Sequence, residues 1–133
     1  MSVAKTNTPV ARCFQLTINE IDRAGDLLNY LRGLGPNYML AGKEKAPTTG
    51  HLHMHIYVQF PTPRRLSLKK CCGAHIEKTR GSTEQNIKYI RKPDTEIVVE
   101  EGEARLNHVP TISVSGFLIY FIFCSVEPLV FSI

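Results

Sequence analysis

The strongest constraint on the fold is the stretch from residue 53 to residue 60, which reads His-Met-His-Ile-Tyr-Val-Gln-Phe. Polar and apolar side chains alternate with a period of two, and Gly50 and Pro61 bracket the stretch, which predicts a β-strand. Residues i and i+2 of a strand project to the same side, so one face is apolar and the other carries the adjacent imidazoles of His53 and His55. Imidazole is the commonest side-chain metal ligand, although a half-buried strand with two polar histidines explains the same pattern more simply.

The other expected elements follow from periodicity and from helix and turn signals. An apolar stripe recurs at helical spacing between residues 21 and 31, and Asn19 before it can serve as the N-cap. Ser82 and Gln85 match the capping-box pattern of a later helix, which Pro93 ends. The expected strands are residues 11–18, 38–44, 53–60, 74–79 and 96–100, and the expected helices are residues 19–33, 63–72 and 82–92.

The loop at residues 45–50 is too short for anything but an antiparallel hairpin, which brings Glu44 close to the histidine strand. This order of elements predicts an α+β fold, in which helices pack on a mainly antiparallel sheet. The chain has 133 residues, enough for one domain, which we expect at residues 11–108 after a polar, disordered tail at residues 1–10.

Residues 109–133 differ in kind from the rest of the chain. Residues 112–126 are almost wholly apolar, but fifteen residues are fewer than the ~20 that a membrane-spanning helix needs. The interpretations, in order of preference, are a tail outside the domain left by truncation, a weak membrane anchor, and a strand packed on the domain.

Charge is unevenly distributed along the chain. Nine basic residues stand against two acidic ones between residues 61 and 92, whereas five acids stand against one arginine between residues 93 and 105. Such a basic stretch indicates a surface that faces a polyanion, or a solvated charged face. The candidates for nucleic-acid contact are Arg64, Arg65, Lys69, Lys70, Lys78, Arg80, Lys88 and Arg91.

The four cysteines form no disulfide framework and no signal peptide is visible, so we expect an intracellular, reducing compartment.

Tyr89 and Lys92 lie three residues apart on an expected helix and so share a face. A cation beside a phenol favours the phenolate, and tyrosine is among the residues that form covalent intermediates. A lone helical tyrosine more often packs or makes a surface hydrogen bond, so this pair acquires catalytic meaning only beside a metal site.

Three segments, in this order, resemble the motifs of the replication-initiator (Rep) proteins of small circular single-stranded DNA viruses of circovirus, nanovirus and geminivirus type. The first is residues 14–19, Phe-Gln-Leu-Thr-Ile-Asn. The second is the histidine strand, and the third is residues 89–92, Tyr-Ile-Arg-Lys. Segments 73–78 and 81–86 also resemble circoviral sequences, and the resemblance covers residues 11–105.

The resemblance implies a ferredoxin-like endonuclease domain of the HUH class, named for two histidines separated by one hydrophobic residue. It implies that His53, His55 and Glu44 bind a divalent metal, for which Mn²⁺ or Mg²⁺ fits best and Zn²⁺ is an alternative. It further implies that Tyr89 attacks the scissile phosphate and that Lys92 orients Tyr89 or the DNA phosphate. The expected products are a free 3′-OH and a 5′-phosphotyrosyl link.

The resemblance also implies partners and a location. The expected partner is single-stranded DNA at a replication-origin stem-loop in the host nucleus, with homo-oligomers possible. Such proteins normally continue into a helicase domain, but the chain contains no Gly-x-x-x-x-Gly-Lys-Ser/Thr motif. We therefore expect a nuclease domain alone, or a truncated or genome-integrated relic, with the helicase missing from this chain.

Three points stay open at the level of sequence. His51 has the same parity as the pair, so His51/His53 competes with His53/His55, although the residues that follow favour the second. A non-catalytic single-strand-binding module could stack bases on Tyr57 and Tyr89. A small zinc-stabilised domain using the histidines with Cys71 and Cys72 is disfavoured by the spacing.

Overall fold

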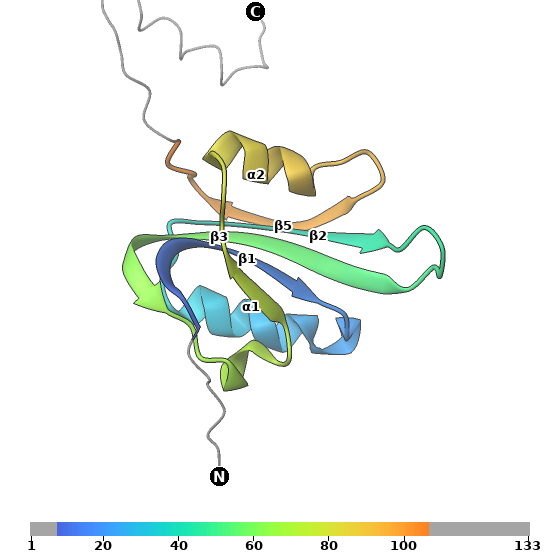
Figure 1. Ribbon diagram of the computed structural model, residues 1–133, viewed down its shortest axis with the longest axis horizontal. Coiled ribbons are helices and arrows are strands. Elements are labelled where there is room, and N and C mark those ends of the chain that lie inside the picture. Colours follow the sequence, from blue (N-terminus) through green and yellow to red (C-terminus); the bar gives the residue numbers. More distant parts are fainter. Residues whose placement is uncertain (1–7, 107–133) are drawn as a thin grey trace, which may run out of the picture.

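The computed structural model describes residues 8–106, at the centre of which lies a five-stranded antiparallel sheet (Figure 1). The strand order is β4-β1-β3-β2-β5, so β3 lies in the middle and pairs with β1 and β2. The strands are β1 (Val10–Ile18), β2 (Tyr38–Lys45), β3 (Leu52–Arg65), β4 (His75–Lys78) and β5 (Glu96–Gly102). The helices are α1 (Ala24–Gly33) and α2 (Thr83–Ile90), and 3-10 turns lie at η1 (Ile21–Arg23) and η2 (Lys69–Cys71).

The two α-helices lie on opposite sides of the sheet (Figure 1). β1, α1 and β2 form a split βαβ unit, because β3 lies between the two strands and runs antiparallel to both. The predicted fold, an antiparallel sheet with helices packed on it, is confirmed.

The alternation along β1 and β3 supplies the main core, which lies under α1. Phe14, Ile56 and Val58 are fully buried there, and α1 contributes Leu27 and Leu31 from its apolar stripe. Burying a side chain of this size stabilises the fold by about 1.5–3 kcal/mol. The stripe that predicted the helix is therefore the stripe that holds it to the sheet.

The other face of the sheet carries α2, whose start is fixed by the predicted capping box. The Ser82 hydroxyl accepts a hydrogen bond from Gln85 N at 3.1 Å, and the Gln85 side chain accepts one from Ser82 N at 2.8 Å. At the other end of α2, Ile90 is fully buried against Tyr38 and Leu40 of β2. The cap and this anchor set the position of Tyr89 over the sheet.

The prediction of a helix at residues 63–72 is wrong, because β3 continues past Pro61 to Arg65 and only the short turn η2 follows. A residue before proline is driven out of the α region, so Pro61 and Pro63 both favour extended backbone before them. Proline also lacks the N–H that a regular ladder needs. The regular pairing of β1 with β3 is interrupted between Ala11 and Cys13, opposite the two prolines. Prolines are tolerated at such an irregularity, because the ladder there does not need their missing N–H groups.

The predicted cap of the first helix is also wrong. Arg23 N donates to Glu20 O at 2.9 Å, which closes the turn η1 before α1 begins at Ala24. Asn19 makes no cap hydrogen bond, and its carbonyl oxygen instead lies 3.1 Å from His51 Nε2. The helix itself ends at Gly33, as expected.

The ends of the described region bear on the predicted domain limits. Thr8 is buried and its hydroxyl donates to Leu66 O at 2.7 Å, so ordered structure includes residues 8–10 of the expected tail. Residues 1–7 and the apolar segment 112–126 lie outside the described residues. Within residues 8–106, no helix is long and apolar enough to cross a bilayer.

Candidate active site

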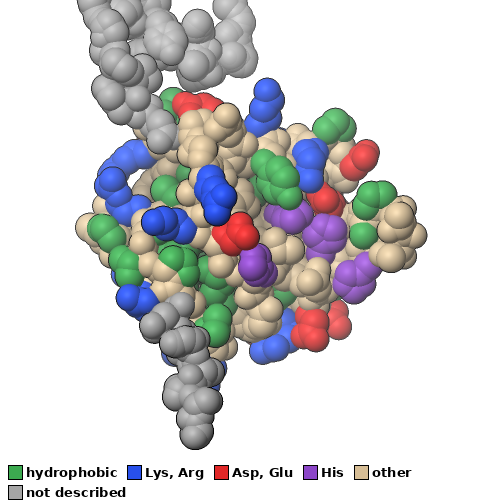
Figure 2. Space-filling model, viewed as in Figure 1, with side chains coloured by type: hydrophobic (Ala, Val, Ile, Leu, Met, Phe, Trp, Pro, Cys, Tyr) green, Lys and Arg blue, Asp and Glu red, His purple; other side chains and the backbone are tan. Residues whose placement is uncertain are grey.

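The β2–β3 hairpin brings the candidate metal ligands together. Glu44 pairs with His53 across the two strands, and Gly42 pairs with His55. Since all four lie at alternating positions, Glu44 and both imidazoles project to the α2 face of the sheet. Figure 2, in which the sheet is seen from its edge as in Figure 1, shows histidine side chains gathered on one side of the molecule, with acidic and basic side chains near them.

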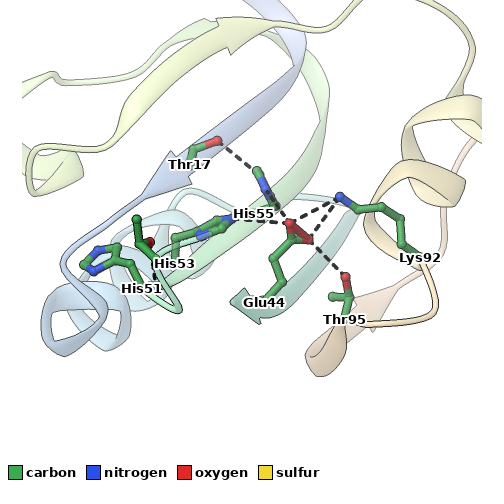
Figure 3. Close-up of polar contacts among 8 residues, drawn as sticks. Thr17, Glu44, His51, His53, His55, Lys92 and Thr95 are labelled. Atoms are coloured by element: carbon green, nitrogen blue, oxygen red, sulfur yellow. Dashed lines mark hydrogen bonds and ion pairs between the residues drawn. The ribbon is translucent and has the colours of Figure 1, made fainter. Parts of the chain in front are cut away.

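The geometry of the three side chains fits a single divalent cation. His53 Nε2 lies 3.4 Å and His55 Nε2 lies 3.8 Å from the same oxygen, Glu44 Oε2 (Figure 3). One ligand atom from each residue lies within 4.8 Å of the others. Ligands bound to one metal at about 2.0–2.2 Å lie roughly 3–3.5 Å apart, so small side-chain movements suffice.

The protonation states also suit metal binding. Partial burial alone would raise the pKa of Glu44, but the hydrogen bond and charge of Lys92 outweigh burial and lower this pKa below its ordinary value. Burial lowers the pKa of His55, against the opposing charge of Glu44. The site therefore offers a carboxylate and, at His55, a neutral imidazole with a free lone pair near pH 7.

Thr17 of β1 fixes the ring of His55 from the side opposite Glu44. Its Oγ1 lies 3.2 Å from His55 Nδ1 (Figure 3). The tautomer that leaves Nε2 free carries its hydrogen on Nδ1 and donates it to this hydroxyl, which is the usual support for a metal-binding histidine. Sequence reasoning missed this role, although the Thr17–His55 pairing follows from the register of β1 and β3.

Lys92 and Thr95 hold the carboxylate of Glu44. Lys92 Nζ lies 3.0 Å from Glu44 Oε1, and the Thr95 hydroxyl donates to the same oxygen at 3.2 Å (Figure 3). This approach depends on Gly42, since a Cβ there would lie 2.4 Å from Thr95 Cγ2 and 3.0 Å from Ile90 Cγ2. Thr95 and Gly42 were not predicted, and a glycine within a strand is the only sequence signal for such a close approach.

Tyr89 stands directly beside this cluster. Its side chain is 48% exposed, and its ring contacts that of His55 edge to face at a centroid distance of 5.3 Å. Lys92 Nζ lies 4.4 Å from the centre of the Tyr89 ring. The predicted pair is therefore brought together with two of the predicted metal ligands. The expected shared helical face is wrong, however, because α2 ends at Ile90 and Lys92 lies beyond it.

The remaining described tyrosines are engaged elsewhere. Tyr57 is 1% exposed and lies under α2, so it is not available to stack a base, contrary to the interpretation as a single-strand-binding module. Tyr38 is buried and donates to Glu100 at 2.7 Å, and Tyr30 accepts a hydrogen bond from Ser67 N at 3.0 Å. Tyr120 lies outside the described residues.

The structure separates His51 from the ligand cluster. His51 precedes β3, is exposed, and directs Nε2 toward Asn19 O rather than toward Glu44 (Figure 3). The described residues thus favour the His53/His55 register. Cys71 is buried in the core beneath the opposite face, so the histidine–cysteine set of a zinc-stabilised domain is not brought together.

The predicted basic contacts fall into separate groups. Two of them, Lys78 and Arg80, line one pocket together with His55 and Tyr89. Lys88 is exposed on α2, whereas Arg91 forms an ion pair with Glu100.

The other four basic residues lie away from the cluster. Arg64 stacks over the Phe60 ring at 5.0 Å, and Arg65 donates to the Thr8 carbonyl. Lys69 and Lys70 belong to η2, which packs near α1 on the other side of the sheet. The basic stretch of the sequence therefore does not form a single surface.

Comparison with known proteins assigns the chain to a family. The family described as putative viral replication protein matches residues 11–93, which is more than half of the chain and includes β1 to α2. The Replication-associated protein of Beak and feather disease virus is 36% identical over 86 residues, which cover 61% of this chain and 29% of that protein. The Replication-associated protein of Human associated cyclovirus 1 is 43% identical over 58 residues, 41% of this chain and 21% of that protein.

The matched part of the chain thus spans less than a third of either relative. These similarities support a role in viral replication. Because the family match covers most of the described residues, including both histidines and Tyr89, the chain belongs to the family of viral replication proteins, the Rep proteins that its three sequence motifs resemble.

Proposed function

We propose that this domain is a metal-dependent endonuclease and strand-joining enzyme, which nicks single-stranded DNA through a 5′-phosphotyrosine intermediate. The proposed substrate is an origin stem-loop of viral type, in the nucleus of a host cell, and nicking would start rolling-circle replication. The observation that carries the proposal is the contact between the exposed Tyr89 ring and His55, one of three candidate metal ligands.

Tyr89 acts as the nucleophile. Its phenolic oxygen attacks the scissile phosphorus, the new bond joins that oxygen to phosphorus, and the bond to the 3′ oxygen breaks. The phenolic proton passes to solvent, and the leaving 3′ oxygen takes up a proton to become a hydroxyl. Since the phosphotyrosine remains a phosphodiester, a later attack by a 3′-OH reverses the step and joins strands.

Glu44, His53 and His55 would hold the metal, with Mn²⁺ or Mg²⁺ as the expected ion. When bound there, it supplies a positive charge that polarises a phosphoryl oxygen of the substrate. Thr17 holds the His55 ring in place through its Nδ1, and Thr95 holds the Glu44 carboxylate.

Lys92 would serve both the nucleophile and the carboxylate. Its ammonium lies beside the Tyr89 ring and forms an ion pair with Glu44. The side chain is flexible, so a short movement would bring the ammonium to an incoming phosphate. Because such placed charges act where negative charge develops, loss of Lys92 should slow nicking without abolishing it.

The test is a nicking assay with a single-stranded circoviral-type origin oligonucleotide. Wild type with Mn²⁺ should release a free 3′-OH fragment and leave a protein–DNA adduct that resists boiling in detergent. EDTA and Tyr89→Phe should each abolish both products, whereas Tyr30→Phe should keep them. An undiminished adduct with Tyr89→Phe would refute the nucleophile assignment, and no adduct from wild type with either metal would refute the enzymatic function.

A further inference from the structure

A polar pocket of about 240 Å³ opens beside the proposed reaction centre, between β4, β1 and the start of α2. Its wall includes His55 and Tyr89, so a nucleotide next to a phosphate at Tyr89 would lie within its reach. This volume is several times that of one water, about 30 Å³, so the pocket has room for a planar group such as a nucleobase.

Two hydrogen-bond acceptors stand side by side in this pocket. Gln15 of β1 and Glu77 of β4 are partners across the sheet, and both line the pocket. His75 Nε2 lies 2.9 Å from Glu77 Oε2, and this hydrogen bond lowers the pKa of Glu77, so a charged carboxylate faces the pocket at neutral pH. A charged carboxylate accepts hydrogen bonds and donates none.

The orientation of the Gln15 amide follows from a chain of hydrogen bonds. Asn86 Nδ2 lies 3.0 Å from Arg80 O and 2.8 Å from Ser82 O. Both partners are acceptors only, so the nitrogen of Asn86 must face them, and Asn86 Oδ1 then accepts from Gln15 Nε2 at 3.0 Å. The oxygen of the Gln15 amide is thereby left on the side away from Asn86.

We propose that this pocket receives one base of the bound DNA strand, and that Gln15 and Glu77 recognise an exocyclic amine on that base. The proposal rests on the proposed function, since it takes single-stranded DNA as the substrate. Adenine, cytosine and guanine carry such an amine, with two hydrogens for two neighbouring acceptors. Thymine has a single N–H flanked by carbonyl oxygens, which the carboxylate of Glu77 repels.

The test measures binding of the full chain to labelled dT12 by fluorescence anisotropy in EDTA, so that no strand is cut. A single central dA, dC or dG should tighten binding by about five-fold or more, because one good pair of base contacts contributes about 1–3 kcal/mol. Replacing dA by 2′-deoxynebularine, or dG by 2′-deoxyinosine, removes only the exocyclic amine and should cancel the gain.

Two variants separate recognition from general binding. Gln15→Met keeps the length of the side chain and should remove the gain, measured against dT12 with the same variant. Because the substitution also removes the hydrogen bond to Asn86, the melting temperature should fall, and binding is measured well below it. Glu77→Gln, which adds a donor, should tighten binding of dT12 itself.

The outcomes also separate the two proposals. Equal binding of all bases, or a gain that survives the loss of the amine or Gln15→Met, overturns amine recognition even if the protein nicks DNA. Absence of binding to every oligonucleotide overturns both proposals.

Discussion

The two halves of the polar face of β3 have opposite roles, although they alternate identically along the sequence. His53 and His55 lie at the open half, where they meet Glu44 beside a half-exposed tyrosine. Tyr57 and Gln59 lie at the closed half, where α2 covers them. The difference teaches that a period of two assigns a face, whereas the element packed above it decides whether that face binds or supports.

The closed half is a hydrogen-bonded clamp. Gln59 Nε2 donates to the hydroxyls of Tyr57 at 3.0 Å and Thr83 at 3.2 Å, and to Arg105 O at 3.0 Å. Gln59 Oε1 accepts from Arg105 N at 2.7 Å and from Asn37 at 2.8 Å. One amide thus joins the start of α2 to the segment after β5, which fixes the helix that carries Tyr89.

The largest expected effect concerns metal binding at the open half. His53→Ala or His55→Ala should weaken Mn²⁺ binding by at least about 100-fold, since even the outer partners of metal ligands contribute 10–100-fold. Calorimetric titration measures the dissociation constants. His51→Ala is the matched control and should bind like wild type, and a strong loss in that variant would restore the His51/His53 register.

Metal binding should depend nearly as strongly on Gly42, whose missing side chain lets Thr95 approach the strand. Gly42→Ala introduces a Cβ against Thr95 and Ile90, which should cost about 1–3 kcal/mol of unfolding free energy and weaken Mn²⁺ binding by displacing Glu44. Urea unfolding and calorimetry measure the two effects. Gly25→Ala, where nothing lies within 4 Å, should instead stabilise α1 by up to about 1 kcal/mol, and equal behaviour of both variants would contradict the close approach.

Removing the hydroxyl of one tyrosine in each half should have opposite effects on stability and on nicking. Tyr57→Phe leaves Gln59 short of a buried partner and should cost about 1–3 kcal/mol of unfolding free energy, with nicking retained at permissive temperature. Tyr89→Phe should leave stability within about 0.5 kcal/mol of wild type and stop nicking. Chemical unfolding and the nicking assay measure the two effects on both variants. The comparison would be wrong if Tyr57→Phe stopped nicking without loss of stability and Tyr89→Phe lost stability but still nicked DNA.

The smallest expected effect is a loss of stability at alkaline pH. Burial raises the pKa of Tyr57 to about 12, and burial with the Glu100 hydrogen bond raises that of Tyr38 as well. Between the unfolded pKa of about 10 and the folded one, the folded state keeps a proton that the unfolded chain releases, so stability falls as pH rises. Unfolding free energies should drop by about 1 kcal/mol from Tyr57 at pH 11, and Tyr57→Phe should flatten the slope.

Sequence patterns predicted much of this fold because the faces of its strands and helices are clearly patterned. The alternation in β3, the stripe in α1 and the Ser82–Gln85 box each mark an element through contacts within a few residues. The failures came where local signals compete. Pro61 indicated the end of β3, but an irregularity in the pairing with β1 lets the strand continue to Arg65. Asn19 has the residue type of a helix cap, but it caps no helix.

The site was predictable in its ligands but not in its supports. Glu44 and the histidines follow from the hairpin. Tyr89 and Lys92 were expected together from helical spacing, but α2 ends at Ile90 and Lys92 approaches from the segment after the helix. Thr17 and Thr95 contact the ligands across strand pairs and a loop that no local pattern specifies. For the same reason the sequence could not show that α2 covers Tyr57 and leaves Tyr89 open.

Mapping the attachment point of DNA tests the central claim most directly. After reaction with origin DNA and Mn²⁺, nuclease trimming and trypsin digestion, mass spectrometry identifies the peptide that carries the residual nucleotide. The account predicts attachment only on the peptide that contains Tyr89, at the open half of the β3 face. Attachment to a peptide that contains Tyr57, Tyr38 or Tyr30 would contradict the assignment.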